Sequence, residues 1–410
     1  MTEWKTAALS DLGEIVGGAT PSTSREDYYN GQIPWLTPKD LAGYPSRYIR
    51  RGQRSITQAG LDSCSARIMP KGTVLFSSRA PIGYVAIAEN DLCTNQGFKS
   101  IVPNPGVSSL FLYYLLRCHR DRIEAMGSGT TFKEVSGATM RGIQVRVPAD
   151  PGVQARIAGI LDALDTKIEL NHRVSANLRQ QAQALFRQWV IDSPDARGWR
   201  RGTFSQLIEN AFGGDWGRES PEGGCVQPVY CLRGADIPEV CAGGRGKMPT
   251  RYIRPKSLKT RRLLDGDLVV EVSGGSPTQS TGRAAVISQA LLDRYDKGLV
   301  CTNFCRALRP VEGYGMFLYH YWQHLYDLGM FFPYENGTTG IKNLDLAGLL
   351  QAEPIVIPQP QLVRRFDGVC QAVAAKVYAN GLESERLAAL RDLLLPRLMS
   401  GELDVSGLRI

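Results

Sequence analysis

The sequence has few of the features that mark membrane, secreted or disulfide-rich proteins. It contains no apolar run of about eighteen residues, the length that a membrane-spanning helix requires. Its first segment, Met1–Leu12, carries Glu3, Lys5 and Asp11 and has no apolar signal core. The nine cysteines are an odd number without a regular framework, which favours buried thiols in a reducing compartment. These absences predict a soluble, cytoplasmic protein.

Catalytic motifs are also incomplete. Gly246-Lys247 is followed by Met248 instead of Ser or Thr, so the phosphate-binding loop pattern fails. Only four histidines occur, and none stands beside a nucleophile motif. We therefore expect a chain that carries no catalytic residues.

A group of carboxylates, Asp265, Asp267 and Glu271, resembles a nuclease cluster on a strand. No lysine follows two residues after Glu271, and the matching positions of the repeat described below carry no carboxylate. A turn that enters a strand is the preferred interpretation, because Asp and Gly often occupy such turns. A metal-dependent nuclease is kept as an alternative.

Two cysteines and two histidines, Cys301, Cys305, His320 and His324, have roughly the ligand spacing of a zinc finger. The repeat keeps Cys93 but has Gly97 where Cys305 is expected to fall. Cysteine is among the most buried residue types, and histidine on an amphipathic helix is usually structural. The sequence therefore favours no metal site.

The chain contains enough apolar residues to form several hydrophobic cores. It also has more basic than acidic residues. With 410 residues and 43% hydrophobic content, two or three domains are expected. The net charge of +8 and the pI of about 9.0 favour an anionic partner without identifying it.

A long internal repeat organises the sequence. Five short segments recur in the same order, displaced by roughly two hundred residues: Ser46–Arg50 with Thr250–Arg254, Lys71–Phe76 with Asp265–Val270, Cys93-Thr94-Asn95 with Cys301-Thr302-Asn303, Gly129-Thr130-Thr131 with Gly337-Thr338-Thr339, and Val147-Pro148 with Ile357-Pro358. Each match is weak alone, but their common order predicts two related domains, here called copy one and copy two.

Each copy alternates short β-branched runs with loops rich in Gly, Pro, Asn and Ser, which predicts a mixed α+β domain of about 150 residues. The predicted strands are 74–77, 85–88 and 145–147 in copy one and 268–272, 284–287 and 355–357 in copy two. One amphipathic helix is predicted in each, around 108–124 and 314–328.

A helix with steps of four and three follows each domain, the spacing of a coiled-coil seam. The seam positions that we expect between the helices are Leu164, Ile168, Asn171, Ser175, Leu178 and Leu185 in the first helix and Val373, Val377, Asn380, Ser384, Leu387 and Leu394 in the second. A single helix lying on its own domain explains the apolar face. It does not explain why Asn and then Ser interrupt the seam at matching positions in both copies.

The course of the chain predicts that the two helices run antiparallel, with one domain at each end and a pseudo-twofold relation between the copies. About 33 residues of helix span roughly 50 Å. In this arrangement Asn171 faces Ser384 and Ser175 faces Asn380. A central polar layer of this kind fixes the register at some cost in stability.

The loops of both copies carry the residue types that read nucleic acid. Arg and Lys address guanine or phosphate, Asn and Gln match adenine, and Gly-Thr-Thr turns offer N–H groups and hydroxyls to phosphate. For any single loop, a merely solvated turn is an equally good interpretation. The candidate DNA-binding residues are Thr20, Ser22, Lys39, Ser78, Arg79, Asn95, Gln96, Thr130, Thr131 and Lys133 in copy one, and Arg233, Ser273, Gln279, Asn303, Thr338, Thr339, Lys342 and Asn343 in copy two.

The two helical segments carry a resemblance to a known family. Gln154–Glu169 (QARIAGILDALDTKIE), continuing to Leu185–Trp189 (LFRQW), and Leu387–Leu403 (LAALRDLLLPRLMSGEL) are similar to the two shared helical regions of type I restriction-modification specificity subunits. The resemblance covers essentially the whole chain. Copy two departs most, because its Gly- and Cys-rich stretch 213–246 does not align with 17–43.

The resemblance implies target-recognition domains at 1–150 and 196–360, a first spacer helix at 151–195, and a second helix with a tail at 361–410. It implies that each domain reads one half of a split DNA site at a fixed separation. It also implies two adenine methyltransferase (modification) subunits on the helices and a restriction subunit that completes the endonuclease. The specificity subunit performs no chemistry, and S-adenosylmethionine, ATP and Mg²⁺ are expected on the partners, none on this chain.

A second hypothesis remains open at this stage. Two domains on a helical strut also suit a protein–protein adaptor that binds no DNA and whose basic charge is incidental. Exposure of Arg79, Lys133 and Lys342 on a common side would favour DNA.

Overall fold

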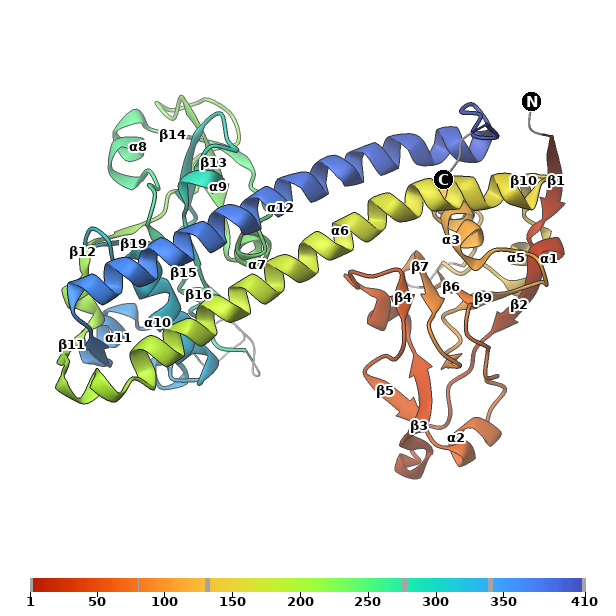
Figure 1. Cartoon of the computed structure of the whole chain (residues 1–410), viewed down its shortest axis with the longest axis horizontal. Helices are drawn as coiled ribbons and strands as arrows, with labels where there is room; N and C mark the ends of the chain where they lie inside the picture. Colours follow the sequence, from red (N-terminus) through yellow and green to blue (C-terminus); the bar gives the residue numbers. More distant parts are fainter. Residues whose placement is uncertain (1–2, 80, 130–132, 275–278, 338–341, 408–410) are drawn as a thin grey trace. The chain divides into compact units, whose positions relative to one another are not determined.

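The computed structural model describes residues 3–79, 81–129, 133–274, 279–337 and 342–407 (Figure 1). The chain forms two compact units, unit 1 (Met1–Glu169 with Arg386–Ile410) and unit 2 (Leu170–Glu385). The division passes through the two longest helices, α6 (Pro151–Phe186) and α12 (Pro360–Ser400). Each unit therefore consists of one globule together with a part of each long helix.

The described residues of unit 1 form three small sheets. They are the antiparallel pair β1 (Trp4–Ala8) and β10 (Gln144–Pro148); a five-stranded sheet in the order β2 (Gly13–Gly17), β9 (Lys99–Pro103), β6 (Val74–Ser78), β7 (Ile82–Ala88), β4 (Tyr48–Ile49); and a three-stranded sheet in the order β5 (Arg54–Ile56), β3 (Tyr29–Leu36), β8 (Cys93–Thr94).

The described residues of unit 2 repeat this plan with one further sheet and without a strand equivalent to β4. Its sheets are the pair β11 (Arg200–Thr203) and β22 (Pro354–Ile357); a four-stranded sheet β12 (Ile208–Gly213), β19 (Cys305–Pro310), β15 (Leu268–Glu271), β17 (Ala284–Val286); a three-stranded sheet β14 (Thr250–Ile253), β13 (Gln227–Leu232), β18 (Gly298–Cys301); and a further sheet β16 (Ser273–Gly274), β21 (Lys342–Leu344), β20 (Glu335–Asn336).

Strand directions as well as strand order agree between the units. In unit 1, β3 pairs antiparallel with β5 and parallel with β8. In unit 2, β13 pairs antiparallel with β14 and parallel with β18. The fold class is the expected one: two similar mixed α and β domains that are joined by long helices. The twofold relation between them stays a prediction.

One of the five repeat matches is wrong as a structural equivalence. Tyr48 and Ile49 form β4, which pairs with β7, whereas Tyr252 and Ile253 belong to β14, which pairs with β13. The strand that takes the place of β14 in unit 1 is β5. A short Arg-Tyr-Ile-Arg string recurs by chance near the true equivalent, and sequence alone does not distinguish the two.

A second match is shifted by one residue. Leu36 of β3 pairs with Thr94, and its equivalent Leu232 of β13 pairs with Cys301. Thr94 is therefore equivalent to Cys301, and the two Cys-Thr-Asn strings are one position out of register. The matches at β6 with β15 and at β10 with β22 hold, and the Gly-Thr-Thr match lies outside the described residues.

The predicted strands and helices form in both units, with ends that differ by a few residues. The first predicted helix is divided at His119 into α3 (Ser109–Cys118) and α4 (Arg120–Ala125), and the second is α10 (Gly315–Asp327). The hydroxyl of Ser108 caps α3 by accepting from the N–H of Phe111 at 3.3 Å. No helix among the residues placed by the structure is long and apolar enough to cross a membrane.

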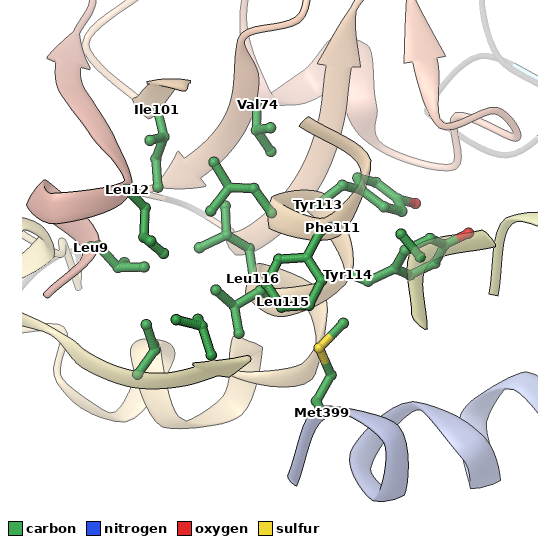
Figure 2. Close-up of a cluster of buried hydrophobic side chains, with 14 of the residues drawn as sticks. Leu9, Leu12, Val74, Ile101, Phe111, Tyr113, Tyr114, Leu115, Leu116 and Met399 are labelled. Atoms are coloured by element: carbon green, nitrogen blue, oxygen red, sulfur yellow. The ribbon is translucent and has the colours of Figure 1, made fainter. Parts of the chain in front are cut away.

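The core of unit 1 lies between its large sheet and the long helices. Leu112, Leu115 and Leu116 of α3 are fully buried there. Figure 2 shows Leu115 and Leu116 of α3 gathered with Val74, Ile101 and Leu9, and Met399 of α12 facing the same cluster. A helix that is apolar on most sides is buried on most sides, as α3 is.

The core of unit 2 contains a cluster of aromatic side chains. Phe186 of α6 contacts Phe317 and Tyr321 of α10, with ring centroids 5.7 and 5.3 Å apart, and Phe366 of α12 at 5.6 Å. Edge-to-face packing of this kind contributes stabilising free energy in addition to that gained from burying the rings. It ties both long helices to the globule of this unit.

Within each unit α6 and α12 run antiparallel. In unit 1, Asp165 forms an ion pair with Arg391 at 2.5 Å. In unit 2, the amide of Asn380 donates to the hydroxyl of Ser175 at 3.1 Å, and that of Asn171 donates to Ser384 at 3.4 Å. This is the central pairing that the sequence predicts.

Candidate nucleic-acid interface

In unit 1 the candidate residues meet at a turn, Asn95–Phe98, that follows β8. Gln96 is exposed at its tip and accepts a hydrogen bond from the hydroxyl of Thr20. A Cβ on Gly18 would lie 2.1 Å from the carbonyl oxygen of Thr94, so only glycine allows this close approach. The loop that holds Thr20 is thereby fixed beside the turn, and Ser22 is exposed on the same loop.

The end of β6 reaches the same turn. The N–H of Ser78 donates to the carbonyl of Gly97 at 2.8 Å. The Ser78 hydroxyl is buried and lacks a hydrogen-bond partner in the described part of the chain. Arg79, which is half-buried, forms a β-bridge with Glu134, next to the exposed Lys133. Ser78, Arg79 and Lys133 thus lie close to the turn.

Lys39 completes the group from a short helix, η2 (Pro38–Leu41). The carboxylate of Asp40 accepts from the N–H of Thr37 at 2.7 Å and holds the helix in place. Pro38 packs so closely on the turn that a Cβ at Gly97 would lie 2.7 Å from its ring. The side chain of Lys39 is exposed.

Unit 2 builds the equivalent turn from Thr302–Cys305. The N–H of Cys305 donates to the carbonyl of Thr302 at 3.0 Å, and Asn303 is exposed at the tip. Gly214 has the role of Gly18, because a Cβ there would lie 2.1 Å from the Thr302 carbonyl oxygen. The Gly-rich stretch that the sequence could not align therefore begins with the same close contact.

The small extra sheet of unit 2 carries three of its candidates. The hydroxyl of Ser273 donates to the amide oxygen of Asn343 at 2.6 Å. Lys342 forms an ion pair with Glu335 at 2.8 Å and lies over the ring of Phe332, 5.1 Å from its centroid. Asn343 is exposed, whereas the charge of Lys342 is already paired.

Arg233 also has a structural partner. Its guanidinium binds both carboxylate oxygens of Asp236, at 2.9 and 3.0 Å, and donates to the carbonyl of Lys247 at 2.7 Å. Burial alone would raise the pKa of Asp236. The hydrogen bonds from Arg233 and from the backbone N–H groups of Lys247 and Arg233 outweigh it and lower that pKa. Arg233 therefore orders its loop.

Five candidate DNA-binding residues remain. Thr130, Thr131, Thr338 and Thr339 lie outside the described residues. Gln279 is exposed.

The predicted helix interface is also described. Asn171, Ser175, Asn380, Ser384 and Val377 are buried. The other predicted seam residues are half-buried: Leu164, Ile168, Leu178, Leu185, Val373, Leu387 and Leu394.

The carboxylates that resemble a nuclease cluster are held apart by separate partners. Arg309 binds both oxygens of Asp267, at 2.9 and 2.8 Å. Arg283 binds both oxygens of Glu271, at 2.8 and 2.7 Å. Asp265 accepts from the N–H of Gln289 at 2.7 Å. These contacts use the oxygens that metal ions would need.

Of the Cys and His residues with zinc-like spacing, Cys301, Cys305 and His320 are buried and His324 is half-buried. Cys301 belongs to β18, and burial raises the pKa of the Cys305 thiol to about 11. His320 lies on α10 against α6, with Nδ1 2.7 Å from the amide oxygen of Gln183, and burial lowers its pKa to about 3. No group of three or more potential ligands occurs among the residues described here.

Sequence reasoning missed a buried arginine that holds the globule of unit 1 to α6. Arg47 donates to the hydroxyl of Thr166 at 2.8 Å and to the carbonyl of Asp162 at 3.0 Å, and it forms an ion pair with Glu169 at 3.5 Å. Its side chain is only 6% exposed. In the sequence Arg47 is recognisable only as a part of the repeat, and the residues next to it do not indicate a contact with α6.

The geometry defines a class of protein. Two domains of similar topology each place exposed polar side chains at an equivalent turn, with exposed lysines beside the turn in unit 1, and each domain packs on parts of two antiparallel helices. These are features of a two-domain recognition protein.

Comparison with known proteins identifies the family to which this chain belongs. Residues 1–180 match the family model described as type I restriction modification DNA specificity domain. The MjaIX specificity subunit, a type I restriction enzyme subunit of Methanocaldococcus jannaschii, is 32% identical over 99% of this chain and 95% of that protein. The EcoR124I/EcoR124II specificity subunit of Escherichia coli is 24% identical over 46% of each chain. The chain belongs to the family of type I restriction enzyme specificity subunits.

A solved structure supports the fold. The crystal structure of the type I restriction-modification S subunit from M. genitalium covers 97% of this chain and 96% of its own length, with a TM-score of 0.56 and 15% sequence identity. At this identity the likeness concerns the fold alone.

Proposed function

We propose that this chain recognises a bipartite DNA sequence and directs the enzymes of a type I restriction-modification complex to it. The observation that carries the proposal is the repeated turn. The frame is the same in both units, but the tip residues are Gln96 and Gly97 in unit 1 and Asn303 and Phe304 in unit 2. A constant frame with variable tips suits two readers of different short sequences.

In this proposal the chain performs no chemistry itself. Two modification subunits bind the long helices and methylate adenine with S-adenosylmethionine, and a restriction subunit cleaves DNA with ATP and Mg²⁺. The pairing of Asp267 with Arg309 and of Glu271 with Arg283 supports a structural role for these two carboxylates. The cytoplasm, where chromosomal DNA lies, is the proposed location.

The charge pattern supports phosphate contact more strongly in unit 1 than in unit 2. Lys39 and Lys133 are exposed beside the turn of unit 1, whereas Lys342 is paired with Glu335. Duplex DNA carries a dense array of phosphates that attracts such cations. A protein–protein adaptor does not require them.

Methylome sequencing tests the proposal. Cells with the intact gene are compared with cells that lack it, and with cells in which a plasmid restores it. We expect one bipartite, adenine-methylated motif to disappear and return. An unchanged set of methylated motifs, in cells whose modification subunit is present, would favour the adaptor.

A further inference from the structure

Phe304 is an apolar side chain at the centre of a polar loop group. Its side chain is 62% exposed. Its neighbour in the turn is the exposed Asn303, and the end of β15 leads directly to Ser273, which binds Asn343. Single exposed apolar residues are common on proteins. The position of this one is unusual because it is held rigidly among candidate DNA contacts.

Hydrogen bonds hold the backbone of the turn and so fix the point from which the Phe304 side chain projects. The carbonyl of Phe304 accepts from the N–H of Val272 at 2.9 Å and from that of Ser273 at 3.2 Å. The N–H of Cys305 closes the turn onto Thr302 at 3.0 Å. The backbone of this turn need not reorganise on binding, and such preorganisation lowers the cost of recognition.

Unit 1 has glycine at the same position. The N–H of Ser78 donates to the carbonyl of Gly97 as the N–H of Val272 does to that of Phe304. Pro38 closes the space at Gly97, since a Cβ there would meet its ring at 2.7 Å. Unit 2 has Gly234 where unit 1 has Pro38, so no proline ring stands at this position in unit 2.

The equivalence of Pro38 and Gly234 rests on the loops that contain them. Asp40 accepts from the N–H of Thr37 at 2.7 Å, and Asp236 accepts from that of Arg233 at 3.0 Å. The short helices η2 and η6 (Gly234–Asp236) begin directly after Thr37 and Arg233. Unit 1 therefore has proline in the short helix and glycine in the turn, whereas unit 2 has glycine in the short helix and phenylalanine in the turn. The aromatic tip is found only in the turn of unit 2.

We propose that Phe304 inserts as an apolar wedge between two stacked base pairs of the half-site that unit 2 binds. The inference rests on the proposed function and adds a residue that reads DNA by deforming it. Apolar side chains placed between base steps unstack and kink the duplex, and the step that unstacks most readily is preferred. The cluster around Phe304 supplies polar groups for the neighbouring bases, and among the residues that the structure describes the ring is mostly exposed to solvent.

The test uses the assembled methyltransferase complex and a duplex that carries the wild-type methylated motif. 2-Aminopurine, which fluoresces when it unstacks, replaces one base at a time in the half-site of unit 2. We expect the wild-type complex to raise fluorescence at one step and Phe304→Ala to remove that rise. Affinity should fall about 5- to 150-fold, the range for loss of one aromatic contact with a base.

Matched variants separate insertion from other effects. Phe304→Leu keeps an apolar wedge and should retain most of the fluorescence rise. Val226→Ala changes another exposed apolar residue, 58% exposed, just before β13 at the strand end away from Arg233, and should behave as wild type. Thermal unfolding should be the same for Phe304→Ala and wild type, because the ring is mostly in solvent.

Two results would overturn the wedge. One is unchanged affinity and unchanged fluorescence in Phe304→Ala. The other is a loss of affinity that disappears when uracil replaces thymine in the half-site, because the ring would then contact a thymine methyl group without insertion. If the wild-type complex neither binds nor methylates the motif, the proposed function fails first, and that outcome is distinct from both.

Discussion

The amide of Asn171 on α6 donates to the hydroxyl of Ser384 on α12 at 3.4 Å, inside the buried seam of unit 2. One turn further along α6, Ser175 accepts from Asn380 at 3.1 Å. The same amide of Asn171 also reaches Glu383 at 2.8 Å. Polar groups at seam positions satisfy one another only in one register, so they select that register at the expense of apolar burial.

Replacing the four polar seam residues by leucine should therefore stabilise the chain. We expect Asn171→Leu, Ser175→Leu, Asn380→Leu and Ser384→Leu together to raise the unfolding free energy by about 1–4 kcal/mol, the range for replacing buried ion pairs by apolar residues. Calorimetric unfolding of the full chain measures this. A photo-crosslinker at Leu178 should find one partner position in the wild type and several in the variant. A lower melting temperature with a single crosslink would contradict the assigned role.

Loss of the Arg47 contacts should weaken unit 1 and loosen its attachment to α6. Arg47→Met removes the hydrogen bonds to Thr166 and Asp162 and the pair with Glu169. We expect a loss of about 2–3 kcal/mol, because hydrogen bonds that involve a charged group are left unmade in a mostly buried site. The exposed Arg50→Met serves as the control. In the methylome, Arg47→Met should also permit half-site separations that the wild type rejects; equal stability and an unchanged separation would count against the contact.

The buried His320 should make unit 2 sensitive to acid. Burial lowers its pKa from 6.5 to about 3, so below pH 6.5 the unfolded chain binds a proton that the folded chain does not. Stability from this group is complete above pH 6.5 and falls by up to about 1.4 kcal/mol per pH unit toward pH 3. His320→Gln should flatten that decline in urea unfolding at pH 7, 6 and 5. His172→Gln, at an exposed site of the same unit, should leave the decline intact; a parallel decline in both variants would refute the assignment.

Lys133 should contribute to affinity without contributing to sequence choice. Lys133→Ala removes an exposed cation beside Arg79, so binding to every duplex should weaken several-fold. The slope of log affinity against log salt should become smaller by about 0.9, the value for one phosphate contact. Lys71→Ala, at the opposite end of β6, is the control. A changed methylation motif in Lys133→Ala would instead indicate a base contact.

The sequence predicts the repeat, the helices and the polar seam because these depend on local periodicity. The seam residues recur every three or four positions, and Gly72 and Gly266 precede equivalent strands with positive φ of 87° and 83°. Such features produce patterns among residues that lie close together in the sequence. They could be predicted without knowledge of the tertiary contacts.

The candidate site is predicted less well because its parts come from distant segments. The exchange of Pro38 for Gly234 and of Gly97 for Phe304 only becomes visible once the turn is superposed on its equivalent. Lys342 and Arg233 looked like open cations, but Glu335 and Asp236 neutralise them. Side-chain pairing between loops depends on tertiary contacts and produces no regular spacing of residues in the sequence.

The central claim is that each unit reads its own half of one DNA site through equivalent turns. Methylome sequencing of cells that carry Gln96→Ala or Asn303→Ala tests this most directly. We expect Gln96→Ala to relax the sequence of one half of the motif and Asn303→Ala to relax only the other half, with the separation of the halves unchanged. If both variants altered the same half, or neither altered the motif while methylation continued, the claim would be contradicted.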